Sequence, residues 1–415
     1  MTRLPGDLDD YRAQARKWLA DNLERPATST RHTRVRGELP TPEHLSAQRA
    51  LQRKLFEGGY AGITWPREYG GQGLTPQHQR VFEQEAAGYV VPDFAPLHNT
   101  TFAVCAPTLL VHASTELKAR HIPAILAGEE LWAQFFSEPA AGSDLAAIRT
   151  RAVRDGDRWI VNGSKTWSSG AMLADYAMCL TRTDATKPKH KGLTWFVIAT
   201  DAPGLTIRPI REITGGAEFC EDFLDDVVVA DSQRIGEVNA GWDVTSTMLG
   251  FERSAGKTND DRLGGPPGEL PRDLVDLARR RGLSADGPTR QLIAQVHIND
   301  FIQRQLGRRI VDQITATGEP ALASYLKLAD GTFTAFRART TLELAGSSGI
   351  AWADGEDSGH AAAMTYLNAR TRSIAGGTNE MQRNGIGERV LGLEREPSAD
   401  HGKPFDEIIR QTRRS

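Results

Sequence analysis

The chain has 415 residues, more than one compact domain usually holds, so we expect two or three domains. Its formal net charge of -3 excludes a general electrostatic attraction to nucleic acid or to an anionic membrane. The sequence has no apolar run of the ~18 residues that a membrane span needs, no signal-peptide core, and three widely spaced cysteines that form neither a metal motif nor a disulfide framework. These features predict a cytoplasmic protein that binds neither nucleic acid nor membrane and holds no metal.

The first third of the chain has the apolar spacing of amphipathic helices. One predicted face contains Tyr11, Ala15, Trp18, Leu19 and Leu23. Thr41-Pro42 is typical of a helix start, and Gly58-Gly59 of a helix end. We therefore expect residues 1–130 to form an N-terminal helical domain.

A strand pattern replaces the helical pattern from about Leu131. Strands are predicted at Trp159–Val161, Leu193–Ile198, Leu205–Ile210 and Val227–Val229, with turns at 155–157 and 202–204. The dipeptide Asn162-Gly163 is read as a tight hairpin turn. We expect residues 131–240 to form a small β domain.

The helical pattern returns after Gly241. Helices are predicted over residues 243–254, 288–315, 321–345 and 360–371, and a last one after Gly376-Gly377-Thr378. Residues 241–415 should therefore form a C-terminal helical domain. The order of helices, strands and helices indicates an α+β multidomain protein and not an alternating βαβ fold.

Three local features could carry chemistry. The loop Ser137–Asp144 follows an apolar run and offers N–H groups and hydroxyls to a flat polar ligand, although an ordinary turn would look the same. Trp167 stands among hydroxyls in Lys165–Gly170 and could stack on an aromatic cofactor or simply fill a core. The glycines of Gly376–Glu380 open a helix, where they fit either a bound diphosphate or a plain cap.

Together and in this order, these features resemble the acyl-CoA dehydrogenase family. Three segments carry the resemblance, which covers essentially the whole chain: Trp65–Leu74, Phe135–Leu145 and Gln382–Leu393. It implies N-terminal helices, a middle β-barrel and a C-terminal four-helix bundle. It also implies bound FAD and conversion of an acyl-CoA thioester to its trans-2-enoyl form, as in fatty-acid β-oxidation.

The resemblance assigns roles by position. Ser137 and Ser169 correspond to residues that bond the isoalloxazine ring, Phe136 and Trp167 to residues that line it, and Ser143 to a contact with the substrate thioester region.

Four further positions correspond to contacts at the other end of the cofactor. Thr378 and Glu380 match contacts to the adenosine side of FAD, and Gly346 and Gly349 match a loop that touches the FAD of another subunit. The family therefore implies a homodimer or homotetramer, with electron-transfer flavoprotein as electron acceptor.

The expected catalytic base departs from the commoner pattern. Many members place a Glu directly before Gly-Thr in the C-terminal motif, where this chain has Gly376, which can donate only its backbone N–H to the thioester oxygen. A minority places the base on the helix that opens the C-terminal domain. The matching residue is Glu252, which would share a helix face with Met248, and Arg253 beside it is taken as a substrate contact. The alternative is a solvated or Arg-paired Glu.

Several alternatives stay open at this stage. The usual Arg and Phe-Gly pair is missing from residues 279–291, so a heterotetramer remains an alternative to a homo-oligomer. The substrate handle can be CoA or an acyl-carrier protein, and the acyl group can be branched or steroid-like. The scaffold also suits a flavin oxidase or monooxygenase, or a non-catalytic subunit of a heteromeric enzyme.

Overall fold

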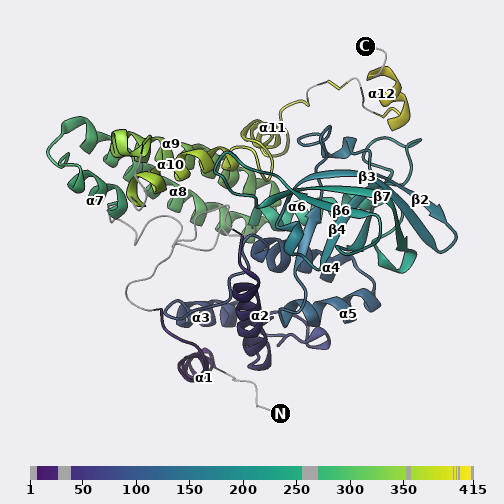
Figure 1. Ribbon diagram of the computed structural model, residues 1–415, viewed down its shortest axis with the longest axis horizontal. Coiled ribbons are helices and arrows are strands. Elements are labelled where there is room, and N and C mark those ends of the chain that lie inside the picture. Colours follow the sequence, from purple (N-terminus) through teal and green to yellow (C-terminus); the bar gives the residue numbers. More distant parts are fainter. Residues whose placement is uncertain are drawn as a thin grey trace.

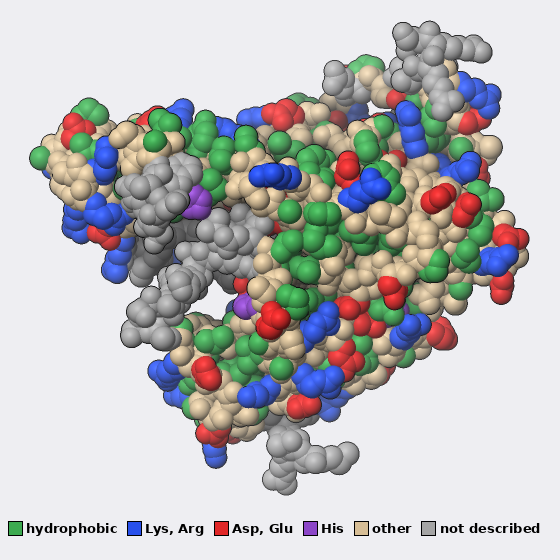
Figure 2. Space-filling model, in the orientation of Figure 1, with side chains coloured by type: hydrophobic (Ala, Val, Ile, Leu, Met, Phe, Trp, Pro, Cys, Tyr) green, Lys and Arg blue, Asp and Glu red, His purple; other side chains and the backbone are tan. Residues whose placement is uncertain are grey.

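The computed structural model describes the fold from α1 near the N-terminus to α12 near the C-terminus. The described residues are 7–26, 39–254, 270–351, 357–395, 397–398, 400 and 402–412. Helices α1–α5 lie below a β domain, and the bundle α7–α10 extends to one side of both (Figure 1). Basic and acidic side chains are interspersed over the described part of the face drawn in Figure 2. This order of elements confirms the predicted α+β architecture.

The N-terminal region consists of helices α1 (Leu8–Asn22), α2 (Pro42–Glu57), α3 (Pro76–Ala86), α4 (Ala106–His112) and α5 (Thr115–Leu126), and a π-helix, η2 (Thr100–Cys105). The predicted start of α2 is confirmed, because Thr41 Oγ1 accepts the N–H of His44 at 3.2 Å. Tyr11, Ala15 and Leu19 are buried along α1, as their spacing predicts.

The strands are β1 (Trp132–Phe135), β2 (Arg151–Asp155), β3 (Arg158–Ser169), β4 (Tyr176–Arg182), β5 (Leu193–Ala199), β6 (Leu205–Pro209), β7 (Phe219–Ala230) and β8 (Arg234–Ile235). Hydrogen bonds join them in the order β6-β7-β3-β2-β4-β5-β8, with β1 beside β4. Side chains alternate between the two faces of the sheet. Cys179 and Phe196 enter one core, whereas Met178 and Val197 pack against helices in another.

The hairpin turn predicted at Asn162-Gly163 is wrong. Strand β3 continues through both residues, and the chain reverses at Gly156 between β2 and β3. Asn162 Nδ2 instead donates to Asp226 Oδ1 on β7 at 2.8 Å. A Cβ on Gly163 would lie 2.4 Å from Thr150 Oγ1, so this glycine allows a close approach of neighbouring backbone and not a turn.

The C-terminal helices are α6 (Gly241–Ser254), α7 (Arg272–Arg280), α8 (Gly287–Thr317), α9 (Ala323–Ala345), α10 (Asp357–Arg372), α11 (Asn379–Arg389) and α12 (Phe405–Thr412). Leu277 of α7, Ile293 of α8, Leu344 of α9 and Ala362 of α10 share one buried cluster. This cluster confirms the predicted four-helix bundle. In the described chain, no helix combines the length and apolar character of a membrane span.

Helix α12 was not predicted. It lies against the β domain, far along the chain from the bundle (Figure 1). The backbone N–H of Phe405 donates to Lys187 O at 3.0 Å, and the buried Phe405 ring lies 3.9 Å from the Arg182 guanidinium carbon. The last described helix therefore covers part of the middle domain.

Candidate active site

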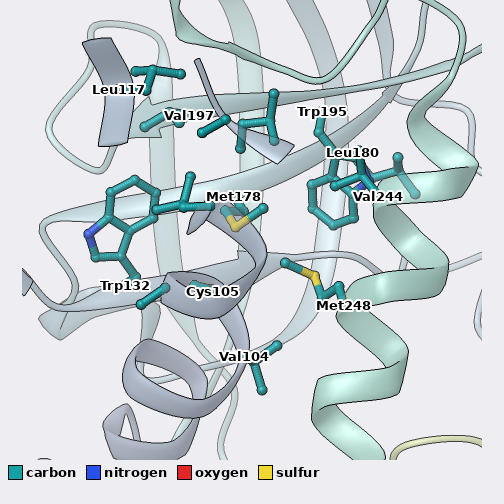
Figure 3. Packing of buried hydrophobic residues seen from close by; sticks show 14 of the residues in the cluster. Val104, Cys105, Leu117, Trp132, Met178, Leu180, Trp195, Val197, Val244 and Met248 are labelled. Atoms are coloured by element: carbon teal, nitrogen blue, oxygen red, sulfur yellow. The ribbon is translucent and has the colours of Figure 1, made fainter. Parts of the chain in front are cut away.

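Helix α6, which carries Glu252, is docked on the sheet by two polar contacts. Trp195 Nε1 on β5 donates to Thr245 Oγ1 at 3.0 Å, and Gln134 Nε2 on β1 donates to Met248 Sδ at 3.0 Å. Figure 3 shows Met248 and Val244 of α6 pointing into the cluster that contains Trp195. Glu252 lies one helical turn beyond Met248. It is therefore on the same helix face, just past the apolar contact that Met248 makes.

Two helices and a turn each contribute one residue at the end of α6. Gly376 has φ 66°, and a Cβ built on it would lie 3.3 Å from Glu252 Oε1 and 3.4 Å from Lys327 Cε. Lys327 belongs to α9, and Gly376 lies in the turn between α10 and α11. We call Glu252, Lys327 and Gly376 the helical side of the site. The carboxylate of Glu252 therefore reaches the space from which a side chain at position 376 would start.

The central motif and the end of β3 meet on the sheet. The backbone N–H of Thr166 donates to Ser137 O at 2.9 Å, which joins the loop after β1 to β3. Phe136 is buried edge-on to Trp195, whereas Trp167 is 58% exposed with φ 65° and stands edge-on to Phe219. We call Phe136, Ser137, Trp167 and Ser169 the strand side of the site.

A buried ion pair lies directly beneath the strand side. Lys165 Nζ donates to Glu138 Oε1 at 2.9 Å and to Phe136 O at 3.1 Å, and the Lys165 side chain is fully buried. Glu138 also accepts the N–H groups of Arg149 and Thr150 at 2.6 and 2.9 Å. Burial opposes ionisation of Glu138, but Lys165 and these donors outweigh it and hold the pKa of the carboxyl below its usual value.

A second buried carboxyl lies opposite Lys165 on the neighbouring strand. Asp222 of β7 pairs with Lys165 in the register of the sheet and accepts Ser168 Oγ at 2.5 Å. Burial raises the pKa of Asp222 to about 7, although Ser168 and Lys165 act in the opposite direction. Lys165 and Asp222 thus support the backbone on both sides of Trp167. The sequence analysis assigned neither residue a role.

The remaining substrate-side predictions fall in different environments. Ser143 is exposed in the loop after β1, and its neighbour Asp144 pairs with Lys189 at 2.8 Å. Arg253 lies at the end of α6, and its side chain is outside the part of the chain that the structure describes.

The predicted nucleotide contacts divide into two places. Thr378 caps α11, where its Oγ1 accepts the N–H of Met381 at 3.2 Å, and the exposed Glu380 lies 3.5 Å from Arg383. Gly346 and Gly349 lie beyond the last residue of α9. At the rise of an α-helix, Gly346 is about 28 Å along α9 from Lys327. One chain therefore does not bring this glycine pair to the helical side.

The chain matches models for three consecutive domains of one family. They are the acyl-CoA dehydrogenase N-terminal domain over residues 7–129, the middle domain over 133–227 and the C-terminal domain over 272–391.

Individual relatives cover most of the chain. The acyl-CoA dehydrogenase IpdE1 of Mycobacterium tuberculosis is 34% identical over 390 residues, which are 94% of this chain and 99% of the relative. FadE34 of the same organism is 36% identical over 348 residues. The matched region is 83% of this chain and 46% of FadE34.

Two solved structures are similar over nearly the whole chain. The Tcur3481-Tcur3483 steroid ACAD has a TM-score of 0.74 at 29% identity, covering 95% of this chain and 100% of the other. The ChsE4-ChsE5 complex from M. tuberculosis has a TM-score of 0.71 at 27% identity, covering 96% and 100%.

Proposed function

The chain belongs to the acyl-CoA dehydrogenase family, whose members act on CH–CH bonds, and we propose that it oxidises an acyl-CoA to the trans-2-enoyl thioester with Glu252 as base. The observation that carries this proposal is the position of the Glu252 carboxylate, 3.3 Å from where a Cβ on Gly376 would stand. A base delivered from α6 thereby serves the space that a Glu at position 376 would serve. The missing Glu at 376 does not remove the chemistry from this chain.

The residues of the strand side fit FAD. Trp167 exposes an aromatic ring beside Ser137 and Ser169, which offer hydroxyls and backbone groups for the polar edge of a flat heteroaromatic ring. Bound FAD would supply the acceptor for the hydride that leaves the β carbon. The buried Lys165–Glu138 pair keeps the Ser137 and Thr166 peptides together and so orients those groups.

Glu252 takes the proton from the α carbon and becomes a neutral carboxylic acid. An α C–H is a weak acid, so the negative charge that develops on the thioester oxygen needs hydrogen-bond donors. We assign this role to the backbone N–H of Gly376, because Gly376 lies next to Glu252. Met248 and Val244 make the adjoining part of α6 apolar, which strengthens these interactions by excluding water.

We also propose that the enzyme works as an oligomer with electron-transfer flavoprotein as its acceptor. The distance of Gly346 and Gly349 from the helical side supports contact with FAD in another subunit. Because the chain is similar to the ChsE4-ChsE5 complex and to the Tcur3481-Tcur3483 protein, we keep a heteromeric assembly as an alternative to a homomeric one. Mass measurement of the native complex, after expression alone and with candidate partners, distinguishes the two.

A bulky acyl group is the substrate class that we favour. Gly376 has no side chain to narrow the site, and the 29% identical Tcur3481-Tcur3483 protein is named as a steroid ACAD. Higher kcat/KM with a ring-bearing thioester than with octanoyl-CoA would support this class. Strict preference for octanoyl-CoA would exclude it.

The substitution Glu252→Gln tests the proposed function. We expect the purified variant to keep its FAD and to bleach ~10²–10⁴-fold more slowly with acyl-CoA under anaerobic conditions, because a positioned base contributes about that factor. Asp243→Asn, on the exposed face of the same helix, is the matched control and should bleach at the normal rate. Unchanged bleaching in Glu252→Gln would show that the base lies elsewhere. A colourless wild-type protein that FAD does not restore would favour a non-catalytic subunit.

A further inference from the structure

Lys327 is a half-buried cation that the sequence did not single out. It lies in the first third of α9, and its Nζ donates to the carbonyl of Arg372 at the end of α10. This hydrogen bond ties α9 to the start of the turn that carries Gly376. Lys327 Cε also lies 3.4 Å from the Cβ position of Gly376, beside the Glu252 carboxylate. Its stem therefore lines the same space as the proposed base.

The charges around Lys327 come from three helices. Burial lowers the pKa of its ammonium, Asp330 of α9 and Glu252 of α6 raise it, and Arg372 of α10 lowers it further. The Glu252 charge also acts on the Cys105 thiol of the π-helix, whose pKa is raised by burial and, to a smaller extent, by that charge. Glu252 is thus coupled electrostatically to the Lys327 cation and to a buried thiol that stays protonated.

We propose that Lys327 is a positioning residue for the α-proton transfer, which holds Glu252 ionised and directed at the Gly376 space. This inference rests on the proposed function. The α C–H bond breaks, its proton passes to a Glu252 oxygen, and its electron pair remains on the thioester as an enolate. Lys327 keeps all its protons throughout. It acts by stabilising the carboxylate before transfer, because a nearby opposite charge favours the ionised form.

The sign of the pH effect follows from this role. Only ionised Glu252 accepts a proton, so the rate falls on the acid side as the carboxylate is protonated. Removing the Lys327 charge favours the protonated form, so the acid limb of the pH–rate profile must move to higher pH. At pH values above the limb the rate should be nearly unchanged. A residue that served only to hold the α10–α11 turn would lower the rate at every pH alike.

The test uses the FAD-loaded protein and a 3-thiaacyl-CoA that carries a ring in its acyl group. This probe has an α C–H to ionise, but sulfur replaces the β carbon and no β-hydride can leave. Exchange of its α-hydrogen with D₂O, followed by mass spectrometry from pH 5 to 9, therefore reports proton transfer alone. We expect Lys327→Met to shift the acid limb upward and to slow exchange roughly tenfold or more at the acid end. Lys327→Arg should restore most of the wild-type profile, since it returns the positive charge.

Two controls separate the possible failures. Arg339→Met removes an exposed cation from the same helix and should leave the profile unchanged. Glu252→Gln should abolish exchange, and if it does not, the proposed function fails before Lys327 is judged. If Glu252→Gln is inactive but Lys327→Met exchanges with an unshifted limb, the role of Lys327 is overturned. Urea unfolding of each variant shows whether a uniform loss of rate comes from a loosened bundle.

Discussion

The strand side and the helical side of the site are built in different ways. On the strand side, Ser137 and Trp167 belong to neighbouring segments that are joined by backbone hydrogen bonds and supported by the buried Lys165–Glu138 pair. On the helical side, Glu252 of α6, Lys327 of α9 and Gly376 of the α10–α11 turn meet around one point. The comparison predicts that substitutions on the strand side mainly lower the free energy of unfolding. Substitutions on the helical side should mainly lower the rate of the reaction.

The largest expected effect tests whether catalysis needs a carboxylate in the space beside Gly376, whichever sequence position supplies it. We expect the double variant Glu252→Gln/Gly376→Glu to recover part of the ~10²–10⁴-fold loss in anaerobic bleaching rate caused by Glu252→Gln alone. Recovery should be incomplete, because φ 66° at position 376 costs a non-glycine residue about 1–2 kcal/mol. Glu252→Gln/Gly376→Gln is the matched control without a carboxylate. Equal rates for the two double variants would break the spatial argument.

On the strand side, the corresponding test is the substitution Lys165→Met. It keeps the length of the stem but leaves the Glu138 carboxylate buried without its cation, so we expect a loss of roughly 3–5 kcal/mol in the free energy of unfolding. Urea unfolding gives the energy, and the absorbance ratio of flavin to protein gives the FAD content, which should also fall. The double variant Lys165→Met/Glu138→Gln should regain part of the stability, since no charge is then stranded. A stable, fully yellow Lys165→Met protein would contradict the contrast between the two sides.

A smaller effect on the same side comes from the pH dependence of Asp222. Its folded-state pKa of about 7 lies above the usual 3.8, so the folded protein binds the extra proton and stability is lost as pH rises from about 4 through 7. Asp222→Asn should remove this contribution, which is of the order of 3 kcal/mol between pH 4 and pH 8. The measurement is the difference in unfolding free energy between variant and wild type across that range. Asp225→Asn, an exposed carboxyl further along β7 that is not among the groups acting on Asp222, should leave the slope unaltered.

Local sequence signals predicted the helices and caps because the atoms involved lie within a few residues. Thr41 accepts the N–H of His44, as the Thr41-Pro42 helix start predicted, and Thr378 accepts the N–H of Met381, where the sequence left a helix cap as one of two alternatives. The Asn162-Gly163 turn failed because non-local contacts, with Asp226 and Thr150, decide the conformation there. The sequence alone therefore predicted those features whose deciding contacts join residues close together in the chain.

The site followed the same rule. The strand-side residues lie in compact motifs that could be read from the sequence, and Glu252 was placed by its helix face and by resemblance. Lys327 could not be found, because a lysine in the middle of a helix usually indicates a solvated face. Its neighbours, Arg372 and Gly376, are more than forty residues away along the chain. The docking of α12 through Phe405 is non-local in the same sense.

The smallest expected effect concerns how far the helical side extends along α11. Glu380 and Arg383 are exposed and 3.5 Å apart, so Glu380→Gln should change the free energy of unfolding by less than about 0.5 kcal/mol. If Glu380 contacts the adenosine end of FAD, the same variant should nevertheless weaken FAD binding several-fold, as measured by titrating the apoprotein with FAD and following flavin fluorescence. Arg383→Gln removes the partner of the pair and controls for the ion pair itself. Unchanged affinity in Glu380→Gln would rule out the Glu380 side chain as a contact to FAD, and the helical side would then not extend to this residue of α11.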